Sequence, residues 1–260
     1  MTAGEKFTLQ PDYARAMAAY GEPRRSSPIS FMEEEHMSSS FIARLGAAGA
    51  IAYGVMEIVG DSLSTTTDST QTPQQIAAYF ASNAPTTATW AGIYIEALGM
   101  FALLIFGAYL WSVGRDREGG RLLAVLALSG GVVQTAAMLA AEPPKIAIFY
   151  RAAQGIDPQI VATLQDMHNA FFFLGFMPQA LLAAAAGGLA IRTGLFPAWL
   201  GWAGIVVAIA MLASIAAPPD SNFHIQANVI FFLWLAVTGG VLLWRTPEIA
   251  PSYSKVPATV

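Results

Sequence analysis

The sequence predicts an all-α polytopic membrane protein: a six-helix transmembrane bundle with both termini in the cytoplasm. Of its 260 residues, 55% are hydrophobic and 12% are charged, whereas about 25% of the residues in a soluble globular domain are charged. Six segments are apolar over about 20 residues, the length that crosses roughly 30 Å of hydrocarbon as a helix. The basic residues collect on one side of these segments.

The six apolar segments define the predicted spans, which short connections join into one membrane domain over residues 41–245. In chain order the spans are residues 41–61, 90–113, 121–141, 169–191, 199–217 and 228–244. The flanking residues 1–40 and 246–260 are predicted to be cytoplasmic tails. We expect the N-terminal tail to be mobile because it has no sustained apolar period.

The positions of lysine and arginine give the predicted orientation, because these residues are enriched in cytoplasmic loops. The chain has 13 of them. Under the six-span interpretation, Lys145 and Arg151 alone fall on the side opposite to the N-terminus. Both termini are therefore predicted to be cytoplasmic, in a multi-pass protein of the cell membrane.

The connection between the first two spans contains a signal for a short helix. Thr72 followed by Pro73 is typical of a helix N-cap and first helical residue. Residues 73–80, Pro-Gln-Gln-Ile-Ala-Ala-Tyr-Phe, are predicted to form a short amphipathic helix. We expect this helix to lie on the membrane surface.

The connection between the third and fourth spans contains a stop signal and a start signal. The proline pair at 143–144 is expected to end the third helix, because proline lacks the backbone donor of a helix interior. Asp157 before Pro158 is typical of an N-cap and first residue. The fourth helix is therefore expected to run unbroken from about residue 158 to 192.

Two carboxylates stand in apolar surroundings, Glu57 in the first predicted span and Glu96 in the second. A charged side chain at the centre of a membrane helix costs about 2.5–3.5 kcal/mol on insertion scales, so such residues are usually retained for a role. Helical spacing places Tyr53 and Asp61 on the same face as Glu57. We predict a polar, partly buried site in which Glu57 and Glu96 face the bundle interior as a proton-handling pair.

Other polar residues are predicted to lie at a similar depth, in the outer half of the bundle. His168 shares a face of the fourth span with Phe172 and Gln179, and it is predicted to orient the substrate or relay a proton to the two acids. The predicted substrate-binding residues are Tyr53, Asp61, Tyr94, Gln134, Phe172, Gln179, His224, Asn228 and Trp234.

These residues predict an integral-membrane enzyme that performs acid-base isomerisation or cyclisation of a lipophilic, terpenoid-like or lipid-like molecule. Burial disfavours the charged form of a carboxyl group, so Glu57 or Glu96 can serve as a general acid. Aromatic rings of the fourth and sixth spans can stabilise developing positive charge. The expected partners are the bilayer and the small molecule. No cofactor, no metal and no nucleic acid is predicted.

Three alternatives remain open. A transporter or an accessory subunit would use the acids for proton relay, cation binding or packing, although no repeated pair of interrupted helices is present. A metal-dependent membrane hydrolase would need His168 and His224 to converge with a carboxylate on zinc, but the chain has no HExxH spacing. In a structural interpretation, Gln134, Gln179 and Asn228 only form interhelical hydrogen bonds.

Two stretches of the chain resemble a known family. They are Asp-Met-His-Asn-Ala-Phe-Phe at 166–172 and Arg-Thr-Gly-Leu-Phe-Pro-Ala-Trp-Leu-Gly-Trp at 192–202. They resemble an uncharacterised bacterial family of six-helix integral-membrane proteins, a domain of unknown function, most strongly over the fourth and fifth spans. The resemblance implies a six-helix fold over residues 42–244 and a role for His168, but no reaction. The membrane acids are also similar in placement to those of small integral-membrane terpene cyclases.

Overall fold

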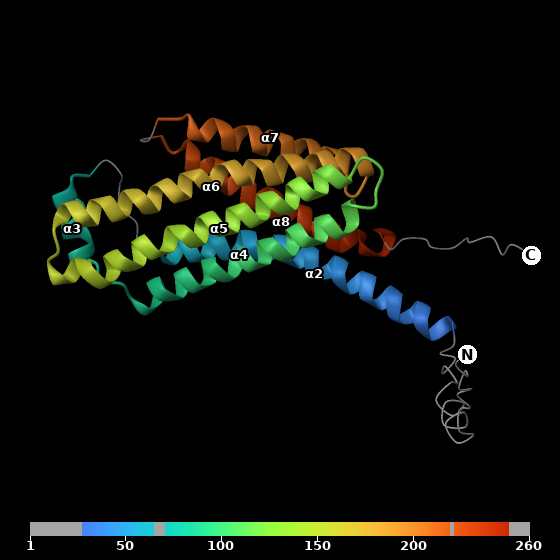
Figure 1. The fold of residues 1–260 in the computed structure, drawn as a ribbon, viewed down its shortest axis with the longest axis horizontal. Helices are drawn as coiled ribbons and strands as arrows, with labels where there is room; N and C mark the ends of the chain where they lie inside the picture. The colour runs from blue at the N-terminus through green and yellow to red at the C-terminus, as the bar shows by residue number, and fades with distance from the viewer. Residues whose placement is uncertain (1–27, 65–70, 219–220, 250–260) are drawn as a thin grey trace, which may run out of the picture. The chain divides into compact units, whose positions relative to one another are not determined.

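The computed structural model describes residues 28–64, 71–218 and 221–249. These residues form helices joined by short connections, without a strand, which confirms the predicted all-α class. The helices are α2 (Pro28–Leu63), α3 (Pro73–Ser82), α4 (Thr87–Gly114), α5 (Arg121–Arg151), the 3-10 helix η1 (Ala152–Gln154), α6 (Pro158–Thr193), α7 (Ala198–Ile215) and α8 (Phe223–Ile249) (Figure 1). Helix α2 begins within the predicted N-terminal tail. Residues 1–27 and 250–260 of the predicted tails lie outside the described residues.

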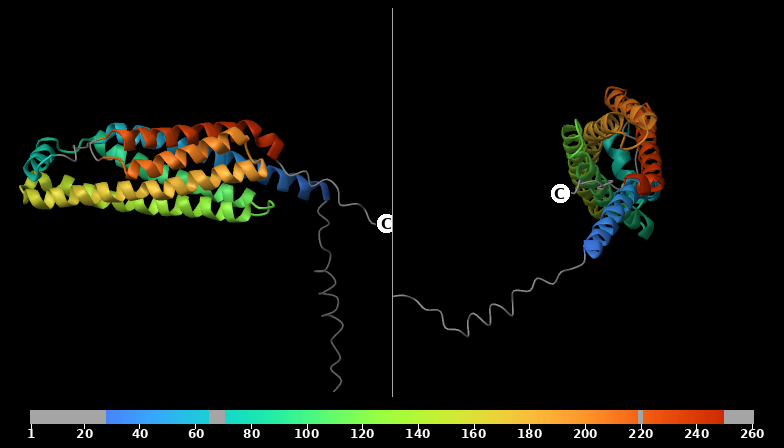
Figure 2. Two further views of the ribbon diagram at one scale, coloured as in Figure 1. Left: turned by 90° about the horizontal axis from the view of Figure 1, so that it is seen from above. Right: turned by 90° about the vertical axis from the view of Figure 1, so that its right-hand side faces the viewer.

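Six helices in the described part are long and apolar enough to cross a membrane, so the chain is a multi-pass membrane protein, as the sequence predicts. The candidate spans are Phe41–Leu63, Thr87–Gly114, Arg121–Gln154, Pro158–Thr193, Ala198–Ile215 and Phe223–Arg245. All six belong to one compact unit, residues 39–260. Six spans that alternate in direction bring the start of the first span and the end of the sixth to the same end of the bundle, and the α2 and α8 ribbons extend from the bundle at this shared end (Figure 2). The side of the membrane that this end faces stays a prediction.

The other end of the bundle carries α3 and the connection between α5 and α6, and we call it the α3 end (Figure 1). The predicted helix start is confirmed: Thr72 Oγ1 accepts a hydrogen bond from the Gln75 backbone, and the Gln75 side chain accepts one from the Thr72 backbone. The apolar residues Ile76 and Phe80 of α3 are buried. Helix α3 therefore packs on the protein through its apolar face, and its position on the membrane surface stays a prediction.

Helices α5 and α6 extend past the shorter helix α7 to reach α3. At about 1.5 Å per residue, the 36 residues of α6 span about 54 Å and the 18 residues of α7 about 27 Å. The extensions, α3 and the start of α4 enclose a second apolar core of Ile76, Phe80, Ile93, Ile148, Phe149, Ala152, Val161 and Ala162. This core fixes the α3 end to the bundle.

The proline pair at 143–144 does not end the third span, so that prediction is wrong: α5 continues to Arg151. Prolines are tolerated in membrane helices when neighbouring elements satisfy the loosened backbone. In the turn before the prolines, the Ala141 carbonyl accepts a hydrogen bond from His168 Nδ1 of α6 at 2.8 Å. Pro144 and Lys145 are buried against neighbouring helices. Contacts with other parts of the protein thus allow α5 to continue past the two prolines.

The half of the bundle away from α3, which contains the α4–α5 connection and which we call the α4–α5 end, packs through small residues. A Cβ added to Gly187 of α6 would lie 2.5 Å from the carbonyl oxygen of Gly201 in α7. A Cβ added to Gly239 of α8 would lie 2.5 Å from the carbonyl oxygen of Ala47 in α2. Glycine therefore permits a close backbone approach at both interfaces, as in other membrane bundles.

Candidate functional site

Glu57 and Glu96 lie in the interface between α2 and α4, and each packs against a glycine of the opposite helix. A Cβ added to Gly99 would lie 2.8 Å from Glu57 Oε1, and a Cβ added to Gly60 would overlap Glu96 Cγ. Glu57 is only 6% exposed and Glu96 is half-buried. The two glycines thus make the space that the two acids occupy between closely packed helices.

A repeated spacing in the sequence encodes this arrangement and was missing from the sequence prediction. Each glutamate precedes a glycine by three residues, as Glu-Ile-Val-Gly at 57–60 and Glu-Ala-Leu-Gly at 96–99. Because α2 and α4 run in opposite directions, the glutamate of each motif meets the glycine of the other. The Glu-x-x-Gly repeat is therefore the sequence signal that joins the two acids.

Polar side chains continue from Glu57 into the bundle. Tyr53, one turn earlier on α2, interacts electrostatically with Glu57 and lies close to the side-chain amides of Gln134 and Gln179. Gln179 Nε2 of α6 donates a hydrogen bond to Asn228 Oδ1 of α8 at 3.3 Å. We call these five residues, which come from α2, α5, α6 and α8, the inner polar cluster.

The inner polar cluster has hydrogen-bonding capacity that the described residues leave unused. Tyr53 and Gln134 are fully buried, and Gln179 is 2% exposed. Among the described residues, the Tyr53 hydroxyl, Glu57 Oε1, both amide atoms of Gln134 and Gln179 Oε1 have no hydrogen-bond partner. An unsatisfied buried polar group costs about 1–3 kcal/mol. Such a concentration indicates a place for water or a ligand.

A charged group lies between the inner polar cluster and the α3 end, and we define it as Asp61, Glu96, Glu142 and Lys145. The charges of its three acids act on Glu57. Lys145 is 4% exposed, and its Nζ donates a hydrogen bond to Ser64 Oγ just beyond the end of α2. Asp61 is exposed. The charged group therefore connects the buried acid with the surface at the α3 end.

Glu142 and Lys145 were not among the predicted site residues. The expected helix end at the proline pair placed them in a connection, whereas they belong to the uninterrupted α5. Lys145 served only to predict the orientation in the membrane. The sequence signal that could have identified them is a glutamate and a lysine on either side of two prolines within a long helical segment.

His168 is held in a defined orientation beside the charged group. Its Nδ1 contacts a carbonyl oxygen, that of Ala141, and must donate a proton there. In the neutral ring Nε2 is then the acceptor. The side chain is half-buried, and the charge of Lys145 acts on it. His168 is therefore placed to exchange a proton through Nε2.

Some predicted binding residues lie away from the inner polar cluster. Tyr94 is 68% exposed and is not part of the inner polar cluster, so its role in substrate binding stays a prediction. Trp234 Nε1 donates a hydrogen bond to the Leu200 carbonyl at 3.1 Å, and its ring fills the space above Gly204. Trp234 thus joins α8 to α7 as a packing residue.

Phe172 and His224 lie in a row of rings on α6 and α8. The Phe172 ring centroid is 5.3 Å from that of Phe176, and the His224 ring is 5.3 Å from Phe173. Among the described residues, no group of three or more His, Asp or Glu side chains is arranged to hold a metal ion. The alternative zinc site of His168, His224 and a carboxylate is therefore not formed by these residues.

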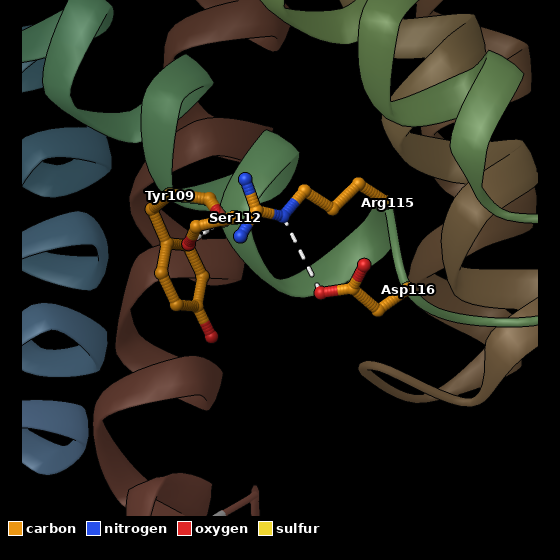
Figure 3. A network of polar contacts seen from close by, with 4 residues as sticks. All are labelled: Tyr109, Ser112, Arg115 and Asp116. Carbon is orange, nitrogen blue, oxygen red and sulfur yellow. Dashed lines mark hydrogen bonds and ion pairs between the residues drawn. The ribbon is translucent and has the colours of Figure 1, made fainter. Parts of the chain in front are cut away.

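The α4–α5 end of α4 shows polar contacts of a different kind. Ser112 Oγ donates to the Tyr109 carbonyl at 2.8 Å, and Arg115 Nε pairs with Asp116 Oδ2 at 3.3 Å (Figure 3). Arg115 and Asp116 are exposed, and surface pairs of this kind contribute about 0–1 kcal/mol. These contacts involve neighbours in sequence and do not join different helices.

The fold and the site together define a class: an all-helical, multi-pass membrane protein with a buried polar cluster between its helices. The chain belongs to the family described as "Domain of unknown function (DUF4386)", whose model matches residues 47–245. The match covers nearly the whole bundle and confirms the resemblance predicted from the sequence. No curated protein and no solved structure matches the chain.

Proposed function

We propose that the chain is an integral-membrane enzyme that isomerises or cyclises a lipophilic small molecule, with Glu57 as its acid-base group. The observation that supports this best is the inner polar cluster. Five of its buried polar atoms, on side chains from α2, α5 and α6, have no partner among the described residues. A packed bundle would not keep so many unmet donors and acceptors unless they bound a ligand or water.

The proposed reaction needs no co-reactant. Glu57 donates its proton to a carbon–carbon double bond of the substrate, whose electron pair forms the new C–H bond. The cation left on the neighbouring carbon either is attacked by a second double bond of the substrate, which closes a ring, or loses a proton directly. Loss of a proton to the Glu57 carboxylate restores a double bond and the protonated acid, which is ordinary general acid-base catalysis.

The neighbours of Glu57 suit this chemistry. The Tyr53 hydroxyl and the Gln134 amide offer hydrogen bonds that can orient a polar group of the substrate. The rings of Phe231 and Phe232 lie with centroids 6.3 and 5.6 Å from the Tyr53 ring. Aromatic faces attract cations within about 6 Å, so these rings can stabilise positive charge on the substrate.

Glu96 and His168 have supporting roles in the proposal. The charge of Glu96 acts on Glu57 across the α2–α4 interface. His168 Nε2 is available as a proton acceptor because Nδ1 donates to Ala141. We assign to Glu96 and His168 the exchange of protons between Glu57 and the α3 end, which resets Glu57 for the next turnover.

A transporter is the less favoured function because few buried polar side chains lie between the inner polar cluster and the α4–α5 end in the described residues. Most of the fully buried side chains there are apolar, among them Leu103, Phe106, Leu110, Leu182, Leu189 and Leu235. The Tyr109 hydroxyl is buried there without a partner among the described residues. The buried hydroxyl of Thr238 in this region donates to the Trp234 carbonyl at 2.7 Å. This supports a site reached from the α3 end.

Deuterium incorporation tests the proposed reaction whichever lipophilic compound is the substrate. Membranes containing the protein are incubated in D₂O with a lipid extract of the cells that make it, and exchangeable deuterium is then washed out with H₂O. We expect mass spectrometry to find a lipophilic compound with carbon-bound deuterium for the wild type and for the exposed control Glu118→Gln, but not for Glu57→Gln. Absence of such a compound with the wild type would contradict the proposed reaction.

We also propose that the α3 end faces outward and that both termini are cytoplasmic in the cell membrane. The support is the basic-residue distribution, because all lysines and arginines but Lys145 and Arg151 lie on the terminal side. Reporter fusions after Ser62 and after Ser252 should report opposite sides of the membrane, with the second inside. Reporters on the same side would contradict this orientation.

A further inference from the structure

The uncharged side chains of the inner polar cluster come together but do not bond to one another. The Tyr53 side chain of α2 lies close to the amides of Gln134 on α5 and Gln179 on α6. Among the described residues, the Tyr53 hydroxyl, both amide atoms of Gln134 and Gln179 Oε1 nevertheless have no hydrogen-bond partner. Three helices therefore bring unpartnered donors and acceptors to the same place.

Packing and a hydrogen bond hold the two amides where they are. The Gln134 amide lies against Gly175 of α6, where an added Cβ would be 3.0 Å from Oε1 and 3.4 Å from Nε2. Gln179 is joined to α8, because its Nε2 donates to Asn228 Oδ1 at 3.3 Å. Gln134 is fully buried and Gln179 is 2% exposed. Neither amide reaches bulk solvent, so a molecule inside the bundle has to supply the missing hydrogen bonds.

The unpartnered atoms select the polar group of that molecule. An amide nitrogen only donates, an amide oxygen only accepts, and a hydroxyl group does both. Because both amide atoms of Gln134 are unpartnered, the site offers a donor and an acceptor whichever way this amide is turned. A ligand hydroxyl can accept from Gln134 and Tyr53 and donate to Gln179 Oε1. An ammonium group would leave the amide N–H groups unmet, and an ether or a carboxylate would leave the amide oxygens unmet.

The aromatic rings beside Tyr53 favour a hydroxyl that is attached to hydrocarbon over a water molecule. The ring centroids of Phe231 and Phe232 lie 6.3 and 5.6 Å from that of Tyr53. Phe231 is fully buried and Phe232 is 6% exposed. Buried water needs two to four polar partners, and apolar surroundings stay dry. An alcohol matches both the polar atoms and the rings, whereas water matches only the polar atoms.

We propose that the ligand of this site is a lipophilic alcohol, whose uncharged hydroxyl group binds between Tyr53, Gln134 and Gln179. This inference rests on the proposed function for the reaction and adds the class of its substrate, an unsaturated alcohol with the reacting double bond toward Glu57. A hydroxyl group brings no charge into the bundle, so it leaves the proton on Glu57 available for the double bond.

Two ligands with the same ten-carbon chain test the polar group of the ligand. Decanol donates and accepts hydrogen bonds, whereas its methyl ether, 1-methoxydecane, only accepts. Each is titrated into the full-length protein in detergent while the Tm is measured, because a ligand that binds the folded state raises the Tm. We expect a saturable rise with an affinity about tenfold higher for decanol, since the ether leaves a buried acceptor unmet. Equal affinities would overturn the inference. So would the absence of a saturable effect of decanol, which is the result for a cluster that holds only water.

Variants assign the preference for decanol to the amide of Gln134. Gln134→Leu and the unbranched Gln134→Met remove both of its polar atoms and should abolish the difference between decanol and its ether. Tyr53→Phe should reduce that difference, because one of the two donors to the ligand is lost. The matched control is Gln226→Leu, which changes an exposed glutamine of α8 and should keep the difference. A wild-type preference for decanol in both Gln134 variants would overturn the inference.

The outcome is distinguishable from failure of the proposed function. Carbon-bound deuterium that depends on Glu57, combined with equal affinities for decanol and its ether, would remove the alcohol and keep the acid-base reaction. A preference for decanol that depends on Gln134, without any deuterium incorporation, would remove the reaction and keep the hydroxyl-binding site.

Discussion

The two halves of the bundle differ in how far their buried polar side chains are hydrogen-bonded. Toward the α4–α5 end, Thr238 donates to Trp234 and Trp234 donates to Leu200, and the Tyr109 hydroxyl is a single buried atom without a partner among the described residues. Toward the α3 end, Tyr53 and Gln134 are equally buried and have no partner among the described residues. Both halves use glycine to bring helices together, but glycine admits a backbone in one half and a carboxyl group in the other.

This difference indicates where stability and function reside. Proteins satisfy their buried polar groups, and exceptions concentrate at functional sites. The half toward the α4–α5 end has one unpartnered buried hydroxyl among the described residues, that of Tyr109, whereas five unpartnered buried atoms gather around Glu57 in the other half. Substitutions should therefore affect mainly folding in the first half and mainly activity in the second.

The largest expected effect is that of Glu57→Gln on turnover. The amide keeps the size and polarity of the side chain but cannot transfer the proton, and general acid-base catalysis typically contributes 10²–10⁴-fold. We expect at least about a 100-fold loss of deuterium incorporation, with thermal stability unchanged or raised because a buried ionisable group is removed. The control is Glu118→Gln. Wild-type turnover in Glu57→Gln would show that Glu57 is not the acid.

The second largest effect is expected for Gly187→Ala, which should lower the free energy of unfolding without a specific loss of turnover. The added Cβ meets the Gly201 carbonyl oxygen at 2.5 Å, and a backbone atom cannot move aside as a side chain can. Overpacking of this kind typically costs about 1–3 kcal/mol. Thermal denaturation should show a lower Tm for Gly187→Ala and no decrease for Gly240→Ala, where an added Cβ meets nothing within 4 Å. Equal Tm values for the two variants would contradict close α6–α7 packing.

Gly99→Ala should have a smaller effect than Gly187→Ala and should lower turnover rather than thermal stability. The atom that is too close is Glu57 Oε1 at 2.8 Å, the free end of a flexible side chain, which can shift. Met56 Cβ at 3.2 Å needs to give by only a few tenths of an ångström, so the helices stay nearly in place. We expect about a tenfold loss of turnover, since misplacement of a catalytic group by about 1 Å can cost up to 10²-fold, with little change in Tm. Gly131→Ala, which meets an atom only at 3.9 Å, should retain turnover. A large fall in Tm for Gly99→Ala would show that this glycine serves packing alone.

The smallest expected effects are those of removing one hydroxyl from each half. Tyr53→Phe removes an unpartnered buried hydroxyl and should stabilise the ligand-free protein by about 1 kcal/mol, whereas Thr238→Val removes a bonded one and should destabilise it by about 0.5–1 kcal/mol. The free energy of unfolding in detergent would measure both. A loss of stability in Tyr53→Phe would indicate that its hydroxyl is satisfied in the protein.

The sequence predicts those features of the fold that are encoded locally. Apolar length marks all six spans, and the Thr72-Pro73 and Asp157-Pro158 pairs mark two helix starts that the structure confirms. The proline pair at 143–144 misled the prediction because contacts distant in sequence, from His168 of α6 and from Ser64 just beyond α2, hold α5 there. A local stop signal carries no information about such contacts.

The candidate site was predictable only in part, for a related reason. Glu57 could be found because a carboxyl group in an apolar span is costly. Tyr94 could not be placed from the sequence because a membrane helix is apolar on every face, so its sequence does not show which face turns inward. It is 68% exposed, although it lies only two residues from Glu96. Lys145 and Glu142 were missed with the wrong helix end.

Whether the inner polar cluster holds a ligand or water is best decided by an electron cryomicroscopy map of the protein purified in lipid from cells that make it, at a resolution that shows bound water. We expect density that is not protein within hydrogen-bonding distance of the Tyr53 hydroxyl, Glu57 Oε1 and the Gln134 amide. A dry cluster, in which these atoms bond to one another and leave no room for water or a ligand, would contradict this expectation.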